Sequence, residues 1–90
     1  MYAVVASRQF AKDYKKCVKR NLDLTLIDGI ILIIAEKGSI PSKNKPHKLS
    51  GNYKESLECH IAPDWLLIWK IDEKNNILNL VRTGTHSDLF

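Results

Sequence analysis

The chain has 90 residues, of which 44% are hydrophobic and 27% charged, so we expect one domain over residues 1–90. Its two cysteines, Cys17 and Cys59, are too few for a disulfide framework and lack the spacing of a zinc site. Met1 leads into a short β-prone run rather than a signal peptide, and no apolar run is long enough to cross a bilayer. We therefore expect a cytoplasmic protein without metal or cofactor.

The charge is divided unevenly along the chain. Residues 1–54 carry eleven Lys or Arg against four Asp or Glu, a net charge of +7. Residues 55–90 carry three against six, a net charge of −3. A basic half favours a polyanionic or acidic partner, although the stretch from Lys12 to Arg20 taken alone is explained as well by a solvated helix face.

The first half of the chain predicts one strand and two helices. Residues 2–6 are β-prone, and Ser7 suits the N-cap of a helix that ends near Asn21. The apolar stripe of this helix consists of Phe10, Tyr14, Cys17 and Val18. A second helix is capped by Asp23 and terminated by Gly38, and its wide apolar face indicates burial against a sheet. Its many β-branched residues also suit a strand, but its length favours a helix.

The second half predicts a loop and three further strands. Residues 39–52 form a polar loop that contains two prolines and a glycine. The strands are expected over residues 53–61, 65–71 and 77–82, followed by a tail over 83–90. The pattern β-α-α-β-β-β predicts an α+β fold. In it, two N-terminal helices pack on one face of a mostly antiparallel four-stranded sheet, and the other face is partly open.

Polar side chains are expected to gather on the open face. Alternation along residues 53–61 places Tyr53, Leu57, Cys59 and Ile61 on one face and Lys54, Ser56, Glu58 and His60 on the other. All three histidines lie in the second half of the chain. We expect one cleft to collect Glu58, His60, Asp64, Arg82 and His86, with His47 at its rim.

This set of residues suits metal-free cleavage of RNA. A base must take a proton from the ribose 2′-OH, an acid must protonate the leaving 5′-oxygen, and a cation must stabilise charge on the phosphate. Histidine can serve either proton role near neutral pH, and Arg82 can bind the phosphate. The lysines expected to contact RNA are Lys43, Lys45, Lys48 and Lys54. Trp65 and Phe90 could stack on an unpaired base.

Each of these residues also has a structural explanation when it is taken singly. A lone histidine is more often structural than catalytic, and Trp65 suits a core position. Phe90 could plug the core at the C-terminus, and Arg82 could be a surface cation paired with Glu58 or Asp88.

Three sequence blocks resemble a known family. They are His47-Lys48-Leu49-x-Gly51, Glu58-Cys59-His60-Ile61-x-Pro63-Asp64-Trp65 and Arg82-Thr83-Gly84-Thr85-His86 with a terminal Leu89-Phe90. Over essentially its whole length the chain resembles the YafQ branch of the RelE/ParE toxin superfamily. The resemblance implies a microbial RNase-like fold and mRNA cleavage in the ribosomal A site. It also implies inhibition by an acidic antitoxin, through which the complex would bind operator DNA.

The resemblance also implies a catalytic set. Carried over by position, it falls on His47, His60, Asp64 and His86, with Glu58, Arg82 and Phe90 as supporting members and Trp65 at a position tied to activity. Glu58 stands where the family often has Asp, which keeps the charge but lengthens the arm. We expect His86 to be the acid or base nearest the scissile phosphate, with His60 and Asp64 as its counterparts. His47 and Arg82 would hold the phosphate.

Three other functions stay open from the sequence. A ParE-like toxin would bind DNA gyrase without cleaving RNA, although such chains typically lack the histidines. A non-enzymatic RNA-binding module would use the basic loop Lys43–Lys48 and would show salt-sensitive binding without cleavage. A degenerate toxin would keep the sequence pattern but be inactive.

Overall fold

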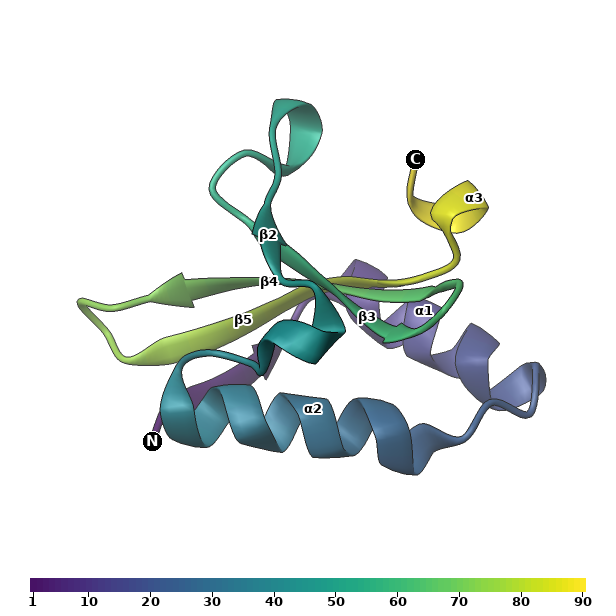
Figure 1. The fold of residues 1–90 in the computed structure, drawn as a ribbon, viewed down its shortest axis with the longest axis horizontal. Coiled ribbons are helices and arrows are strands. Elements are labelled where there is room, and N and C mark those ends of the chain that lie inside the picture. Colours follow the sequence, from purple (N-terminus) through teal and green to yellow (C-terminus); the bar gives the residue numbers. More distant parts are fainter.

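The computed structural model describes residues 1–90 apart from the side chain of Asn52. Its elements are β1 (Ala3–Ala6), α1 (Arg8–Lys19), α2 (Leu24–Lys37), the 3-10 turn η1 (Ser42–Asn44), β2 (His47–Lys48), the 3-10 turn η2 (Gly51–Tyr53), β3 (Leu57–Ala62), β4 (Trp65–Asp72), β5 (Ile77–Gly84) and α3 (His86–Leu89). Helices α1 and α2 lie on one side of the sheet, and the β2–β3 loop and α3 rise from the other (Figure 1). Among the described residues, no helix is long and apolar enough to cross a membrane.

The sheet has five strands in the order β1-β5-β4-β3-β2, so the expectation of a four-stranded sheet was wrong in this detail. The central β3, β4 and β5 are antiparallel neighbours, and β1 pairs in parallel with β5. The additional strand is β2, whose two residues pair with Glu58 and Leu57 within the segment expected to be a loop. A strand of two residues is too short to leave an alternating pattern in the sequence.

The two main helices begin and end where their capping residues predict. The Ser7 hydroxyl accepts a hydrogen bond from the Phe10 N–H at 2.9 Å, and Asp23 accepts one from the Thr25 N–H at 3.1 Å. Helix α2 ends at Gly38, whose φ of 73° is the left-handed conformation that glycine adopts without steric cost. Helix α1 ends just before Asn21, as expected.

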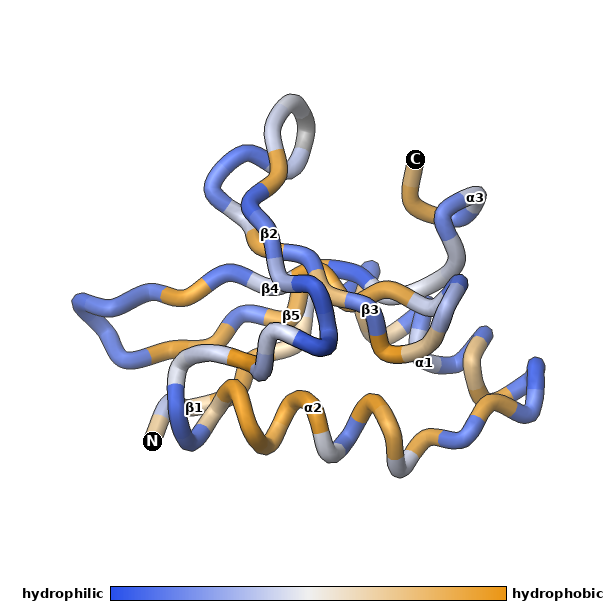
Figure 2. The backbone as a smooth tube through the Cα atoms, viewed as in Figure 1, coloured by the Kyte–Doolittle hydropathy of each residue, from blue (hydrophilic) through white to orange (hydrophobic). Residues whose placement is uncertain are grey.

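The main core lies between the two helices and the sheet. Its buried members include Phe10, Cys17, Ile27, Ile30, Ile34, Cys59, Leu67, Trp69, Leu78 and Leu80. Figure 2 shows the apolar length of α2 beneath the sheet. The predicted stripe of α1 was wrong at Val18, which is 49% exposed, whereas Asp13 on the same helix is buried. Both cysteines are free and buried, and burial raises the pKa of the Cys59 thiol to about 12.

A second, smaller cluster covers part of the other face of the sheet. It consists of Leu66, Ile68 and Leu89, with Leu49, Tyr53 and Val81 packed against them. The expectation that Tyr53 shares a face with Leu57 was wrong, because the strand starts at Leu57 and Tyr53 belongs to η2. The tail after residue 84 forms α3, which this cluster helps to hold.

Candidate active site

Strand register brings polar residues from β2, β3 and β5 into one row. His47 lies opposite Glu58, Glu58 opposite Ile68, and Ile68 opposite Arg82. Residues directly opposite one another in antiparallel strands point to the same face. The row therefore crosses the face that α1 and α2 leave free, as the sequence predicted for Glu58.

His86 and Asp64 form a hydrogen-bonded pair beside His60. The Nδ1 atom of His86 lies 2.8 Å from Oδ1 of Asp64, and the same oxygen accepts the His86 backbone N–H at 3.0 Å. The backbone bond and then the side-chain bond hold the pKa of Asp64 below its usual value. An ionised carboxylate only accepts hydrogen bonds, so Nδ1 carries a proton and Nε2 of neutral His86 keeps its lone pair.

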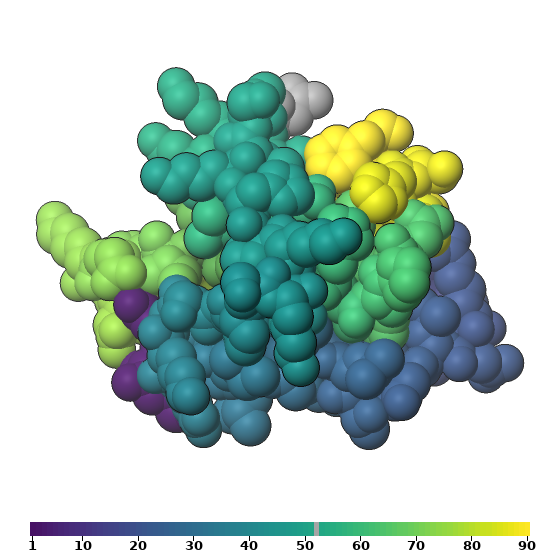
Figure 3. All heavy atoms as spheres, in the orientation of Figure 1, coloured from purple at the N-terminus to yellow at the C-terminus, as the bar shows by residue number. Residues whose placement is uncertain are grey.

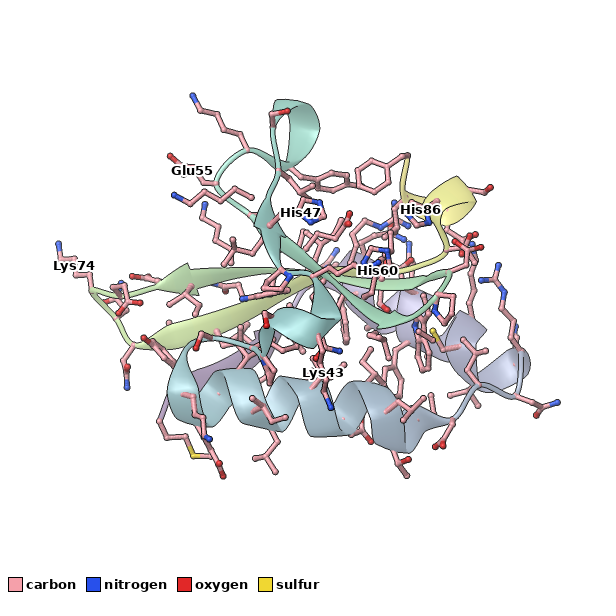
Figure 4. All side chains as sticks on the ribbon, viewed as in Figure 1. Lys43, His47, Glu55, His60, Lys74 and His86 are labelled. Carbon is pink, nitrogen blue, oxygen red and sulfur yellow. The ribbon has the colours of Figure 1, made fainter. Side chains whose placement is uncertain are left out.

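His60 faces His86 across the site, and both lie on the same side of the sheet (Figure 4). Their ring centroids are 5.8 Å apart. Within the described part of the chain, Nδ1 of His60 is buried without a hydrogen-bond partner. A proton on that nitrogen would be an unsatisfied buried donor, which costs about 1–3 kcal/mol. An unprotonated Nδ1 would likewise be an unsatisfied buried acceptor, so burial of this nitrogen costs free energy in either tautomer.

His47 is tied to both the loop and the sheet. Its Nδ1 donates to the Lys45 carbonyl at 3.1 Å, and its Nε2 lies 3.3 Å from Oε1 of Glu58. Glu58 is only 3% exposed, and a buried carboxylate needs a cation or a proton nearby. Because Nδ1 already donates to a carbonyl, two unprotonated acceptors would otherwise face each other. The contact therefore gives His47 a carboxylate partner when its Nε2 carries a proton.

Arg82 is paired with Asp13 of α1, so the expectation of a bond to Glu58 or Asp88 was wrong. Its Nε and Nη2 atoms donate to the two Asp13 carboxylate oxygens at 3.0 and 2.9 Å. Asp13 is 2% exposed, and burial alone would raise its pKa. Hydrogen bonds from Arg82, Gln9 and the Thr83 backbone outweigh burial and lower that pKa. Asp13 was not predicted as a site residue, although it follows Phe10 by three residues and precedes Cys17 by four, inside the apolar stripe.

Tyr53 links Arg82 to the C-terminal segment and was also not predicted as a site residue. Its hydroxyl accepts from Nη1 of Arg82 at 3.5 Å and donates to the Leu89 carbonyl at 3.3 Å. Its ring meets Phe90 edge-on, with centroids 5.7 Å apart. Phe90 is 64% exposed, so it is not the core plug that its position also allowed. Its braced, exposed ring is free to stack on a base.

Trp65 is a core residue in this structure, which corrects the expectation that its ring stacks on RNA. It is 5% exposed, and its indole N–H donates to the Thr83 hydroxyl at 3.0 Å. That hydroxyl in turn donates to the Leu66 carbonyl at 2.7 Å. The hydrogen bond from Trp65 therefore holds the Thr83 side chain on the core face of the sheet, in the segment between Arg82 and His86.

The segment after Thr83 is shaped to present His86. A Cβ atom on Gly84 would lie 2.8 Å from a carboxylate oxygen of Asp88, so only glycine fits there. Thr85 and Asp88 cap α3 reciprocally, and Arg20 donates to Asp88 at 2.7 Å. These contacts give a structural reason for the glycine and for the threonine after it in the Arg82-Thr83-Gly84-Thr85-His86 block.

The four predicted RNA-binding lysines are all exposed: they are Lys43, Lys45, Lys48 and Lys54. Figure 3 shows the β2–β3 loop and the yellow C-terminal segment as neighbours on the same side of the surface. Across the described residues, no group of three or more His, Cys, Asp or Glu side chains is arranged to hold a metal. The gathered groups are imidazoles, carboxylates, a guanidinium and an exposed aromatic ring. They define a small α+β protein in which histidines capable of acid–base chemistry lie beside cationic groups.

Comparison with known proteins gives the family. The profile described as "Bacterial toxin of type II toxin-antitoxin system, YafQ" matches residues 2–90. The chain is also 38% identical over 85 residues to the mRNA interferase toxin YafQ of Escherichia coli strain K12, an alignment that covers 93% of this chain and 90% of that protein. The chain therefore belongs to the YafQ family of toxins of type II toxin–antitoxin systems.

Solved structures of similar proteins share this fold. A histidine-to-glutamine variant of E. coli YafQ superposes with a TM-score of 0.91 at 31% identity, covering 100% of this chain and 99% of that one. A metal-bound toxin from Helicobacter pylori gives 0.91 at 40% identity over all of both chains. YafQ in the E. coli DinJ–YafQ complex gives 0.89 at 32% identity, covering 100% of this chain and 99% of that one. The observed five-stranded α+β architecture is thus that of YafQ.

Proposed function

We propose that this toxin is an endoribonuclease that cleaves mRNA in the ribosomal A site by attack of a ribose 2′-OH on the adjacent phosphate. The observation that carries the proposal is the Asp64–His86 pair, oriented by two hydrogen bonds and facing His60. The name of the E. coli relative, an mRNA interferase, supports the same activity. The three histidines also argue against a ParE-like gyrase toxin.

The tautomers suggest how the proton roles are divided. His86 has an unprotonated Nε2 and is suited to take the proton from the 2′-OH. His47, whose Nε2 lies 3.3 Å from a Glu58 carboxylate oxygen, is suited to protonate the leaving 5′-oxygen. The O2′–P bond would form and the P–O5′ bond would break, which leaves a 2′,3′-cyclic phosphate. His60 would donate from Nε2 to a phosphate oxygen, and Arg82 would add positive charge.

We further propose that the cytoplasmic partners are the translating ribosome, its mRNA and a cognate acidic antitoxin. The net charge of +7 over residues 1–54 favours both an acidic protein and RNA. The E. coli relative has been solved in complex with DinJ, which supports an antitoxin partner here. Binding to operator DNA would occur only through that antitoxin.

Primer extension on a cellular mRNA after induced expression tests the proposal. We expect cuts in register with the reading frame from the wild type and from Lys74→Ala, whose side chain lies at the distant β4–β5 turn (Figure 4). We expect His86→Ala to lose cleavage by at least about 10²-fold, the usual size of a general acid–base contribution. Normal cutting by His86→Ala would contradict the assignment of His86. Growth arrest with intact mRNA would contradict the nuclease proposal and favour a gyrase toxin.

A further inference from the structure

A groove of about 540 Å³ opens along β3 next to His60. One wall is the segment Lys43, Asn44 and Lys45, and the other side is His60 with Ile61, Ala62 and Pro63. In the view of Figure 4, His60 lies between His86 on one side and Lys43 on the other. The groove therefore begins at the candidate active site and leads away from the C-terminal segment that carries His86 and Phe90.

The basic wall is attached to the active-site histidines by hydrogen bonds. The Asn44 side-chain amide donates to the His60 carbonyl at 2.9 Å, and the Lys45 carbonyl accepts from Nδ1 of His47 at 3.1 Å. Strand β2 pairs only with residues 57 and 58, so the outer edge of β3 beyond Glu58 faces this wall. These hydrogen bonds hold residues 43–45 in place beside His47 and His60. Lys43 and Lys45 therefore have a fixed backbone position at the site.

The lining of the groove matches the chemistry of a nucleotide. Two exposed lysines supply positive charge, and no carboxylate is among the residues that line the groove. Ile61, Ala62 and Pro63 supply an apolar surface for a sugar or base edge. The volume is within the range of about 300–1,000 Å³ that is usual for small-ligand pockets. An acidic protein segment would also suit the charge, but His60 at the groove connects it to the place where a phosphate would react.

We infer that this groove is a subsite for the nucleotide next to the scissile phosphate, with Lys43 and Lys45 contacting its flanking phosphate. The exposed Phe90 ring, which packs edge-on against Tyr53 in the C-terminal segment, would stack on another base, so two separate segments would hold the RNA. This inference rests on the proposed function for the identity of the ligand. It adds a position and a direction for the RNA chain that the catalytic residues alone do not give.

Binding to a single-stranded RNA of about six nucleotides that is 2′-O-methylated throughout tests the subsite, because such RNA cannot be cleaved through its 2′ position. The dissociation constant is measured by fluorescence anisotropy at several salt concentrations. Each phosphate contact contributes about 0.7 to the slope of log affinity against log salt. Because Lys43 and Lys45 share one phosphate, we expect the double variant Lys43→Ala/Lys45→Ala to lose about 0.7 from this slope, and the matched control Lys74→Ala to leave it unchanged.

Trimming the RNA supplies the positional test. The difference in affinity between wild type and double variant should disappear when nucleotides are removed from one end and persist when they are removed from the other. A wild type that does not bind the RNA would overturn the subsite, and so would a salt slope in the double variant equal to that of Lys74→Ala. It would also be overturned if trimming either end of the RNA reduced the difference in affinity equally. A double variant that binds RNA normally but loses binding to poly-glutamate would assign the groove to an acidic protein and also overturn it. Wild type that binds this RNA but cleaves no mRNA would refute the proposed function alone.

Discussion

At the scale of single residues, the contacts of Tyr53 show how a short C-terminal segment is kept in place. Helix α3 has only four residues, too few to be stable by itself. The Tyr53 hydroxyl bonds to the Leu89 carbonyl and to Arg82, and its ring braces Phe90. Because His86 begins the same segment, Tyr53 is a positioning residue for the groups at both ends of α3.

Substitutions at Tyr53 separate the ring from the hydroxyl. We expect Tyr53→Phe, which keeps the edge-on contact with Phe90, to change cleavage by less than about 30-fold, the equivalent of two hydrogen bonds of about 1 kcal/mol each. Tyr53→Ala should raise KM more than it lowers kcat, because the platform for the base loses its support. Steady-state cleavage kinetics with a double-mutant cycle against Phe90→Ala provide the measurement. Fully additive effects of Tyr53→Ala and Phe90→Ala would show that the two rings do not act together.

At the scale of elements, the buried pair between Asp13 and Arg82 fastens α1 to β5. Asp13 accepts bonds from the Arg82 guanidinium and from the Thr83 backbone N–H, which lies at 3.2 Å. Its partners therefore include two consecutive residues of the Arg-Thr-Gly-x-His block. Helix α1 thus orients the Arg82 guanidinium, which the proposed mechanism uses on the other face of the sheet.

Replacing Asp13 by Asn tests this connection. The variant leaves Arg82 partly buried without its counter-ion, and we expect the free energy of unfolding to fall by roughly 2–4 kcal/mol. The control Glu36→Gln changes an exposed carboxylate on α2 and should alter stability by no more than about 0.5 kcal/mol. Urea denaturation followed by circular dichroism measures both. Equal stability of the two variants would show that the pair contributes little.

The elements also show what local sequence can and cannot predict. The ends of α1 and α2 were predicted because Ser7, Asp23 and Gly38 act within a few residues of themselves. The partners of Arg82 were not, because Asp13 is 69 residues away and only the tertiary fold brings the two together. Strand β2 and helix α3 escaped prediction because two-residue and four-residue elements carry no period. The three blocks of the resemblance predicted His47, His60, Asp64 and His86 as site residues, but the hydrogen bond between Asp64 and His86 became visible only in the structure.

At the scale of the whole molecule, the ionised Asp13, Asp64 and Asp88 join segments that are far apart in the chain, and Asp72 closes the β4–β5 turn. The pKa is lowered for Asp13, Asp64, Asp72 and Asp88, whose hydrogen-bond partners include Arg82, His86, Asn75 and Arg20 respectively. In the unfolded chain each carboxyl has its ordinary pKa of about 3.9. A group whose pKa is lower in the folded state stabilises the fold above its unfolded pKa and ceases to do so as the pH falls through its folded pKa.

The contribution of these four groups to the free energy of unfolding should therefore be constant from neutral pH down to about pH 5. It should fall steeply below about pH 4. The urea midpoint measured at intervals from pH 7 to pH 2.5 checks this. Asp13→Asn should show a shallower decline than the wild type, because one of the titrating groups is removed. A midpoint that rises on acidification would contradict the assigned direction of these shifts.

The fold as a whole brings together the elements that carry the candidate site: β2, β3, the β3–β4 turn, β5 and the C-terminal segment. Helices α1 and α2 pack against the opposite face of the sheet and form the core with it. The central claim is that the groups collected there cleave RNA by 2′-OH attack. The most direct test is the chemistry of the new ends in mRNA cut by the purified toxin on programmed ribosomes. The account predicts a 5′-hydroxyl, which polynucleotide kinase labels without prior phosphatase treatment, opposite a 2′,3′-cyclic phosphate or the 3′-phosphate formed from it. New ends bearing a 5′-phosphate and a 3′-hydroxyl would contradict it.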